Sequence, residues 1–234
     1  MSLPYFLTPD PRAGILEGAE AKHAHVKRIQ PGERIMLCDG RGTLATATTT
    51  DVTPSRVTAE VVSVEEVAAP TPRVTVVQAV PKGERAELAV DLAVQGGADA
   101  IVPWISHRTI ARWPANKQAK QVQKWRDQAV ASAKQARRAW VPEVGELVTT
   151  NQLAEMLRGF EGHPLVLHED ATESIRDVTF DRDVMLIVGP EGGIGADELE
   201  LIGGRAVKLG PEVLRTASAA FAALCAIGAL SARW

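Results

Sequence analysis

Cysteine is scarce in this sequence. Its 234 residues include two cysteines, Cys38 and Cys225, which lie far apart and in apolar surroundings. Two distant cysteines make neither a disulfide framework nor a cysteine-based metal site, so both classes of small cross-linked domain are excluded. We expect both side chains to be small buried hydrophobes of a protein that is kept in a reducing compartment.

Long apolar runs are also absent. The longest, residues 217–230, is mostly alanine, contains Ser218 and Gly228, and is too short to span a bilayer. Residues 1–10 do not join a basic start to an apolar stretch, as a secretory signal does. The histidines are scattered, at positions 23, 25, 107, 163 and 168, without metal-ligand spacing. We therefore expect a cytoplasmic protein with no membrane partner and no metal.

Net charge is small, at a formal value of −3, but it is unevenly distributed. Segment 108–138 contains one acid, Asp127, among the basic residues Arg108, Arg112, Lys117, Lys120, Lys124, Arg126, Lys134, Arg137 and Arg138. A basic stretch within an acidic chain concentrates positive potential where a phosphate backbone could bind. A solvated helix surface explains the charge alone equally well. Trp113, between Arg112 and Pro114 in a predicted loop, is a candidate for base stacking.

The first part of the chain has the pattern of a small, mostly β domain. One short helix is expected at 20–29, and β-branched residues with partial alternation predict strands at 3–7, 34–38, 42–50 and 56–64. Turn signals such as Pro31-Gly32 separate them. We expect a β-barrel over residues 1–69, followed by a proline-stiffened linker that ends at Pro72.

After the linker, strands and helices alternate. Apolar runs predict strands at 73–80, 100–104, 164–168, 184–188 and 206–209, and helices are expected at 84–95, 117–138 and 217–231. Leu88 and Leu92 should share a face of the first helix, and the second should bury Val122, Trp125, Ala129, Ala133 and Ala136. This alternation favours a domain over 73–234 with a parallel α/β sheet, which binds ligands at the carboxyl ends of its strands.

The run Gly189-Pro-Glu-Gly-Gly193 directly follows a predicted strand. Glycine lets the backbone approach a ligand closely, so the run is a candidate cofactor cradle. It has neither the spacing of the dinucleotide fingerprint nor the Gly-Lys-Ser/Thr of a phosphate loop. A plain Gly/Pro turn is the alternative, but the run is uncommon enough to favour a function.

Two further candidates contain arginine. At residues 209–219 a strand ends, the chain turns through glycine and proline, and a helix of very small residues begins near Thr216. Arg215 at the mouth of that helix could bind a carboxylate, a phosphate or a base carbonyl, or form a surface ion pair with Glu212. Near the end of the basic helix, Gln135, Arg137 and Arg138 could contact RNA or simply stabilise the helix C-terminus.

Together these motifs resemble the 16S ribosomal RNA (uracil-N3) methyltransferases of the SPOUT, or α/β-knot, superfamily. The resemblance extends over nearly the whole chain. It rests on segments 23–32, 82–85 and 106–109, on Gln135 and Arg138 before Pro142, on 189–193, and on Leu209 to Thr216. Two departures occur: Ala217 stands where the family commonly has Glu, and Gln95-Gly96-Gly97 replace its usual Glu-Leu-Gly.

The resemblance implies a PUA-like β-barrel that binds RNA and a methyltransferase domain with a trefoil knot, which dimerises through the helix after Thr216. It implies S-adenosylmethionine as methyl donor, bound by Leu167, His168, Gly189, Gly192, Gly193, Leu209 and Leu214. The target would be N3 of one uridine of 16S ribosomal RNA in the small subunit, with no metal required. RNA contacts would come from Arg28, Arg108, Arg112, Lys117, Gln135 and Arg138.

Three residues are candidates for the chemistry of this reaction. Arg215 is expected to stabilise the uracil anion, Arg138 is the second candidate for that role, and Glu191 is the candidate base. Two alternatives belong to other classes. A non-catalytic RNA-binding protein would not bind the methyl donor, and a nicotinamide enzyme should have a glycine fingerprint where residues 81–84 are Pro-Lys-Gly-Glu.

Overall fold

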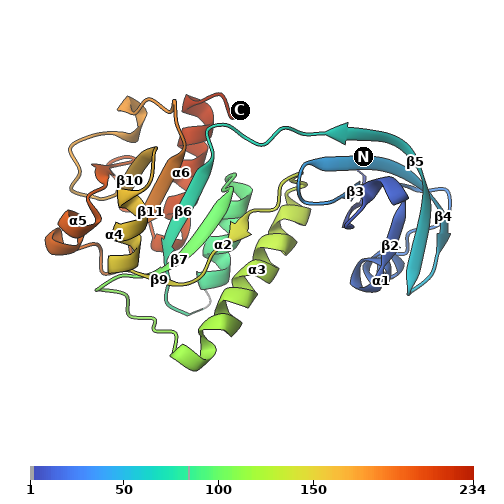
Figure 1. The fold of residues 1–234 in the computed structure, drawn as a ribbon, viewed down its shortest axis with the longest axis horizontal. Coiled ribbons are helices and arrows are strands. Elements are labelled where there is room, and N and C mark those ends of the chain that lie inside the picture. Colours follow the sequence, from blue (N-terminus) through green and yellow to red (C-terminus); the bar gives the residue numbers. More distant parts are fainter. Residues whose placement is uncertain (1–2, 84) are drawn as a thin grey trace. The chain divides into compact units, whose positions relative to one another are not determined.

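The computed structural model describes residues 3–83 and 85–234, and the chain forms two compact units (Figure 1). The first, called the β unit, comprises the chain up to residue 69 together with 133–141. The second, called the α/β unit, comprises 70–132 and 142–234. The chain therefore passes between the units three times. Glu84, where a helix is expected to begin and which belongs to the 82–85 motif, lies outside the described residues.

The β unit is one five-stranded sheet with the order β1-β3-β4-β5-β2. Its elements are β1 (Tyr5–Leu7), a 3-10 turn (Pro11–Ala13), β2 (Ile15–Glu17), α1 (Gly18–Val26), β3 (Arg34–Cys38), β4 (Thr43–Val52) and β5 (Arg56–Glu66). The pair β1–β3 is parallel and the others are antiparallel. The edge strands β1 and β2 are also connected by a hydrogen bond, because the hydroxyl of Thr8, just after β1, donates to the carbonyl of Ile15 in β2 at 2.9 Å.

Alternation along the strands builds the core of this unit. Ile35, Leu37, Ala45 and Ala47 are fully buried and pack with Phe6, Leu16 and the alanines of α1. The helix α1 ends at Val26, earlier than expected, and Arg28 just beyond it has a left-handed backbone with φ of 59°. Strand β2 is not among the expected strands, because its three residues are too few for a visible alternation.

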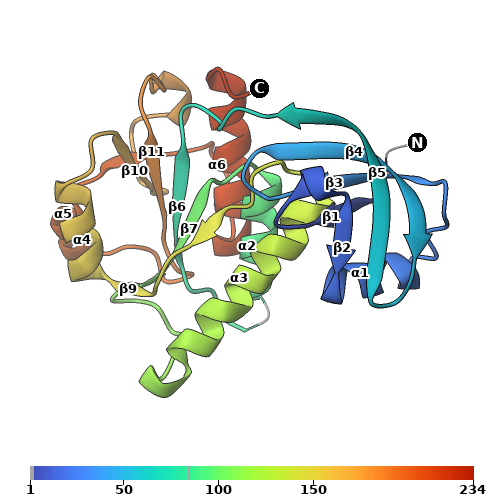
Figure 2. The same cartoon turned by 45° about the vertical axis from the view of Figure 1, so that its right-hand side comes forward.

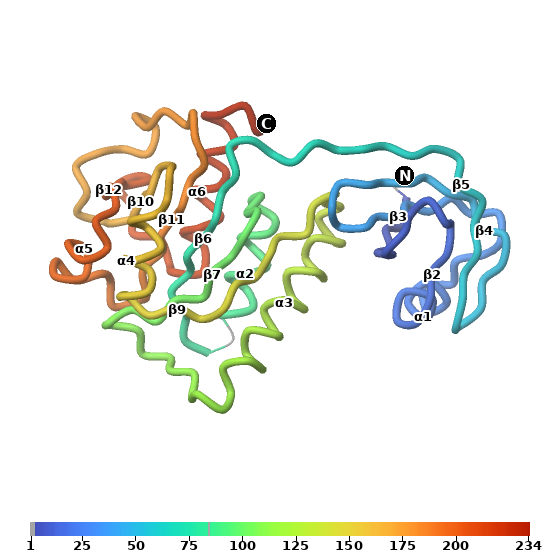
Figure 3. Tube along the Cα trace, in the orientation of Figure 1, coloured from blue at the N-terminus to red at the C-terminus, as the bar shows by residue number. Residues whose placement is uncertain are grey.

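Residues 133–141 belong to the β unit through both backbone and side-chain bonds. The amide of Gly42 donates to Ala139 at 3.0 Å, and the amide of Val141 donates to Gly40 at 2.9 Å. The Tyr5 hydroxyl donates to the carbonyl of Arg138 at 2.8 Å. Figure 3 traces this segment as the continuation of α3.

The α/β unit is built on a sheet whose strand pairs are all parallel, in the order β12-β10-β11-β6-β7-β8, with β9 also on β7. Its strands are β6 (Val74–Ala79), β7 (Ala100–Ile105), β8 (Glu143–Val144), β9 (Val148–Thr149), β10 (His163–Leu167), β11 (Val184–Val188) and β12 (Arg205–Val207). The register places Leu167 beside both Val188 and Val207. The carboxyl ends of β10, β11 and β12 therefore meet at one edge of the sheet.

Helices cover both faces of this sheet (Figures 1 and 2). They are α2 (Arg85–Gln95), α3 (Gln118–Gln135), α4 (Thr150–Arg158), α5 (Ala196–Ile202) and α6 (Thr216–Leu230), with 3-10 turns at Ala115–Lys117 and Ile175–Asp177. Leu153 and Ile202 of α4 and α5 pack on Val77 and Ile187 of one sheet face. On the other face α6 packs against α2, β6 and β11. Among the described helices, none has the length and apolarity of a membrane-crossing segment.

Several expectations about helices need correction. The long helix α3 ends at Gln135 instead of 138, because Arg137 adopts a left-handed conformation with φ of 54°, and Ala136 is exposed. In α2 the buried face is Ala89, Val90, Ala93 and Val94, whereas Leu88 is 47% exposed. Neither α4 nor α5 was expected from the sequence, although Thr149 and Gln152 form a complete capping box at the start of α4. Cys38 is buried as expected, but Cys225 is half-exposed.

Candidate functional site

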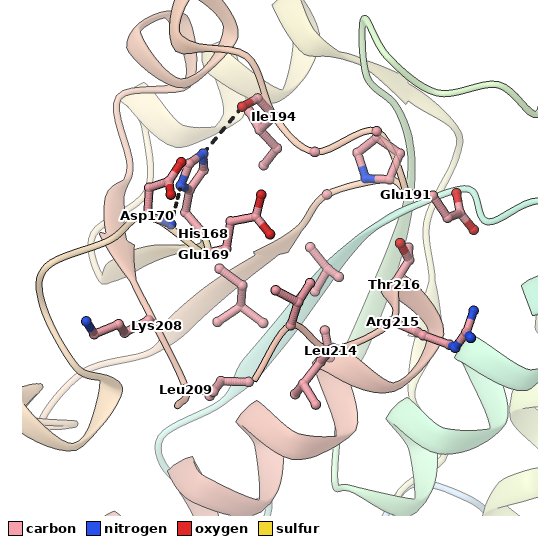
Figure 4. Close-up of a pocket in the computed structure, with 18 of the residues that line it drawn as sticks. His168, Glu169, Asp170, Glu191, Ile194, Lys208, Leu209, Leu214, Arg215 and Thr216 are labelled. Atoms are coloured by element: carbon pink, nitrogen blue, oxygen red, sulfur yellow. Dashed lines mark hydrogen bonds between the residues drawn. The ribbon is translucent and has the colours of Figure 1, made fainter. Parts of the chain in front are cut away.

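A cavity of about 720 Å³ lies where the three strand ends of the α/β unit meet (Figure 4). Three loops line it: 167–170 after β10, 188–196 after β11, and 207–216 between β12 and α6. The structure brings together in this cavity every residue expected to hold a cofactor, namely Leu167, His168, Gly189, Gly192, Gly193, Leu209 and Leu214. A cavity of this size suits a ligand as large as a nucleoside cofactor, whose usual pockets range over about 300–1,000 Å³.

The glycine run after β11 is a tight turn in which side chains are poorly tolerated. Gly193 has φ of +70°, and its amide donates to the carbonyl of Pro190 at 2.9 Å. A Cβ added at Gly189 would lie 2.8 Å from Cγ1 of Ile194, which is buried and cannot withdraw easily. Both positions therefore need glycine, and the turn leaves its backbone close to whatever fills the cavity.

His168 connects two of the three loops. Its Nδ1 accepts a hydrogen bond from the amide of Asp170 at 3.2 Å, and its Nε2 lies 3.4 Å from the carbonyl of Ile194 (Figure 4). This pattern fits a ring that accepts at Nδ1 and donates from Nε2. The side chain thus holds the loop after β10 against the loop after β11.

Arg215 caps the start of α6 at the rim of the cavity. Its exposed side chain extends away from Leu209 and Leu214 (Figure 4). The alternative ion pair with Glu212 is not formed, since within residues 3–83 and 85–234 no salt bridge involves Arg215. A fixed positive charge is therefore available at the cavity entrance.

Glu191, the candidate base, is engaged by the backbone. Its Oε1 accepts a hydrogen bond from the amide of Lys82 at 3.3 Å, and Figure 4 shows the side chain on the same side of the site as Arg215. This contact ties the glycine run to the loop after β6. Glu191 also lines the cavity, and its role as a base stays a prediction.

Arg108, expected to contact RNA, lines the same cavity. Its Nη1 donates to the carbonyl of Gly192 at 3.3 Å, and the space beside Gly192 and Gly195 is filled by Arg108 atoms. The structure thus places this arginine against the glycine run, a contact that charge patterning could not show.

Some of the other basic candidates form ion pairs, whereas others are exposed at the surface. Arg126 forms an ion pair with Glu146 at 2.7 Å, and Lys134 forms one with Glu20 at 2.5 Å. Exposed residues in the same stretch are Arg112, Lys117, Lys120 and Lys124. Trp113 packs edge-on against Trp125, with ring centroids 5.5 Å apart, so part of its surface is already covered.

Three expected RNA contacts, Arg28, Gln135 and Arg138, belong to the β unit. Arg28 is exposed and lines a shallow hollow after α1 together with His25, Val26, Ile29, Gln30, Pro31 and Val52. Gln135 is exposed at the end of α3. Arg138 is half-buried, with its carbonyl bound by Tyr5.

Two buried polar residues of the α/β unit were not expected from the sequence. Gln78, at the end of β6, is 1% exposed and donates to the carbonyl of Thr216 at 3.4 Å. Glu198 in α5 is fully buried. A polar residue inside an otherwise apolar strand could have revealed Gln78, whereas the burial of Glu198 depends on tertiary packing.

The part of the chain that the structure describes contains no cluster of His, Cys, Asp or Glu suited to a metal ion.

Comparison with protein families gives two matches. A model described as an RNA methyltransferase domain matches residues 68–228, and one described as an RNA methyltransferase PUA domain matches residues 16–62. A curated relative, ribosomal RNA small subunit methyltransferase E of Mycobacterium bovis, is 42% identical over 97% of this chain and 90% of its own. The Bacillus subtilis protein of that name is 25% identical over 91% of this chain and 88% of its own.

Solved structures are similar over the same extent. A ribosomal RNA small subunit methyltransferase E from Neisseria gonorrhoeae, bound to S-adenosyl methionine, has a TM-score of 0.87 at 28% identity, and 98% of each chain is covered. A methyltransferase from Legionella pneumophila with bound S-adenosylmethionine has a TM-score of 0.86 at 30% identity and the same coverage.

Proposed function

Because the chain belongs to the ribosomal RNA small subunit methyltransferase E family, we propose that it transfers a methyl group from S-adenosylmethionine to N3 of a uridine in 16S ribosomal RNA. The observation that carries this proposal is the cavity at the carboxyl ends of β10, β11 and β12, which collects the seven expected cofactor residues from three separate loops. Relatives with this fold were solved with the same methyl donor.

The residues of the cavity fit that donor. The glycine run leaves backbone groups accessible at Gly189 and Gly193, and Leu209 and Leu214 provide apolar surface for a flat base. The bound donor supplies a methyl group on a positively charged sulfur. Leu167, His168 and the two glycine-containing loops would hold and orient it, and no metal ligand is needed for that task.

Arg215 has the properties that the transfer requires of a protein group. N3 of uracil carries a proton at neutral pH, so attack on a methyl group needs the anion or proton removal. Negative charge then develops on the neighbouring carbonyl oxygens, and a preorganised donor beside them lowers the barrier. Arg215 keeps its charge at neutral pH and lies at the rim without a carboxylate partner among the described residues. Arg138 is the second candidate.

We assign the RNA-binding role to a PUA-like domain over residues 1–69 and catalysis to a domain over 73–234. RNA contacts would come from Arg28, Arg108, Arg112, Lys117, Gln135 and Arg138, with the small ribosomal subunit as substrate. The catalytic domain would carry a trefoil knot and form a homodimer through α6, whose small side chains permit close approach. Light scattering at micromolar concentration tests the dimer. Ala220 is fully buried within one chain, so the partly exposed Ala222 of α6 is the position where glutamate should disrupt the dimer.

A direct test measures methyl transfer from labelled donor to small ribosomal subunits isolated from cells that lack this protein. We expect incorporation into 16S RNA, at N3 of one uridine when the product nucleosides are identified. Calorimetry should detect donor binding by the protein alone or with RNA. RNA binding without donor binding or transfer would instead support a non-catalytic RNA-binding protein and overturn the proposal.

A further inference from the structure

Glu198 is a fully buried carboxylate for which the proposed chemistry has no role. It lies in α5, which begins at Ala196, shortly after the glycine run, and it is 0% exposed. Burying a carboxylate is costly unless hydrogen bonds compensate, so its partners indicate why the cost is tolerated.

The partners of Glu198 come from two other elements. Its Oε1 accepts from the amide of His107 at 2.8 Å and from the hydroxyl of Thr150, the first residue of α4, at 2.6 Å. Thr150 in turn accepts from the indole of Trp104 at 3.3 Å. These bonds connect the end of β7, the start of α4 and the middle of α5 through one carboxylate oxygen.

The turn that contains His107 is rigid in itself. Ser106 and Thr109 are both buried; the hydroxyl of Thr109 accepts from the amide of Ser106 at 3.0 Å, and the two hydroxyls lie 3.0 Å apart. His107 and Arg108 between them are exposed. A shift of this turn would therefore move Arg108 with it.

Arg108 closes a ring of contacts around the glycine run. It donates to the carbonyl of Gly192, six positions before Glu198, while Glu198 holds the neighbouring amide of His107. The side chains of His107 and Asp197 add a contact of 3.7 Å. The chain from Gly192 to Glu198 is thus fastened at both ends to the same turn.

We propose that Glu198 is the positioning residue of the cofactor loop: by anchoring the turn 106–109 it holds Arg108 against Gly192 and fixes the cavity wall. The inference rests on the proposed function only in naming S-adenosylmethionine as the ligand. If the cavity wall is already ordered before binding, the binding free energy does not have to offset the entropy lost in ordering that wall.

The second carboxylate oxygen supplies a conservative variant. Among residues 3–83 and 85–234, Oε2 of Glu198 has no hydrogen-bond partner. Glu198→Gln can keep both contacts of Oε1 and place its amide nitrogen where that unpartnered oxygen lies. Glu198→Ala removes both contacts and leaves the His107 amide and the buried Thr150 hydroxyl without this acceptor.

A second buried charge in the same unit serves as a control. Arg233 and Asp99 form an ion pair at 2.7 Å with side chains 5% and 7% exposed, and neither residue lines the cavity. Arg233→Met should therefore lower the unfolding temperature without changing the affinity for the donor. This variant shows how far a general loss of stability alone changes donor affinity, as distinct from a displaced cavity wall.

The test measures donor affinity by calorimetry on full-length protein, well below each variant's unfolding temperature. We expect Glu198→Ala to weaken S-adenosylmethionine binding about tenfold or more, as removal of a supporting residue behind a binding site does elsewhere. Glu198→Gln should stay within about threefold of the wild type. Wild-type affinity in Glu198→Ala, or an equal reduction in Arg233→Met, would overturn the proposal.

Hydrogen exchange separates this inference from the proposed function. In Glu198→Ala the amides of 107–109 and 192–195 should exchange faster than in the wild type, whereas Arg233→Met should leave them unchanged. If the wild type binds no donor, the proposed function fails, and exchange alone then decides whether Glu198 anchors the turn. Unchanged exchange in Glu198→Ala would contradict that anchoring whatever the ligand.

Discussion

The ammonium group of Lys134 lies 3.3 Å from Nδ1 of His23 and also pairs with Glu20. Burial, followed by the charges of Lys134 and Lys27, lowers the pKa of His23 below 6.5, although Glu20 acts in the opposite direction. His23 also packs edge-on against Phe6. The folded protein therefore binds the histidine proton more weakly than the unfolded chain does.

The sign of the resulting pH dependence follows from linkage. Because the folded pKa is the lower one, stability falls as pH decreases through 6.5 and stops falling below the folded value. We expect the unfolding temperature to drop between about pH 7.5 and about pH 5, and His23→Gln to flatten that change. Calorimetric scans across this range test it, with His25→Gln in the same helix as control. An unaltered pH profile in His23→Gln would contradict the prediction.

Gly193 and Gly203 are a matched pair for testing the cofactor loop. Both have left-handed backbones, with φ of +70° and +67°, and a Cβ at either would meet no atom closer than 4.0 Å. Alanine at either position should cost about 1–2 kcal/mol of stability. We expect only Gly193→Ala to weaken donor binding, since Gly203 does not line the cavity. Equal affinities in calorimetry would place the donor elsewhere.

The exposed lysines at the start of α3 should carry RNA affinity. Replacing Lys117, Lys120 and Lys124 by glutamate should reduce the slope of log K against log salt by about one unit for each phosphate that the protein no longer binds. Arg126→Gln is the control, because Arg126 already pairs with Glu146. Binding titrations with 16S RNA at several salt concentrations measure the slope. A slope equal to that of the wild type would exclude this surface.

Arg215→Ala should keep its fold and most of its donor affinity while its methyl transfer falls sharply. Removing one well-placed donor from such a site typically slows the reaction about a hundredfold or more. Arg215→Lys should recover only part of the rate, because lysine lacks the planar fork of arginine. Arg205→Ala, whose guanidinium pairs with Glu173 away from the cavity, controls for removal of a surface charge. Near wild-type rates at saturating donor and RNA would make Arg138 the leading candidate.

The sequence predicted the α/β class, the parallel sheet and the preceding β domain, and the structure and family matches confirm that class. Strong local signals made this possible: apolar runs bounded by glycine and proline mark β6, β7, β10 and β11. Leu88 shows where local signals fail. In α2 the buried residues are Ala89, Val90, Ala93 and Val94, while Leu88 is exposed and Leu92 is half-buried. Which apolar face of a helix is buried depends on its packing partner, which in α2 includes α6.

The cavity could be predicted from the glycine runs because glycine at a strand end is a local signal. The residues that hold its wall could not. The family resemblance implied that Arg108 contacts RNA, yet its guanidinium donates to Gly192, a residue 84 positions away in the sequence. Glu198 is buried because α4 and the turn after β7 pack beside it in the folded protein. The spacing of residues within 189–198 contains no sign of that packing.

The three passages of the chain between the units constrain how such a protein could be recombined in evolution. Residues 133–141 are encoded between two segments of the α/β unit, yet they fold with the β unit. A single crossover near residue 70 would deliver a new β unit without the partner for Gly40, Gly42 and Tyr5. Viable chimaeras of two homologues should therefore need a second exchange, so that residues 133–141 come from the same parent as the rest of the β unit.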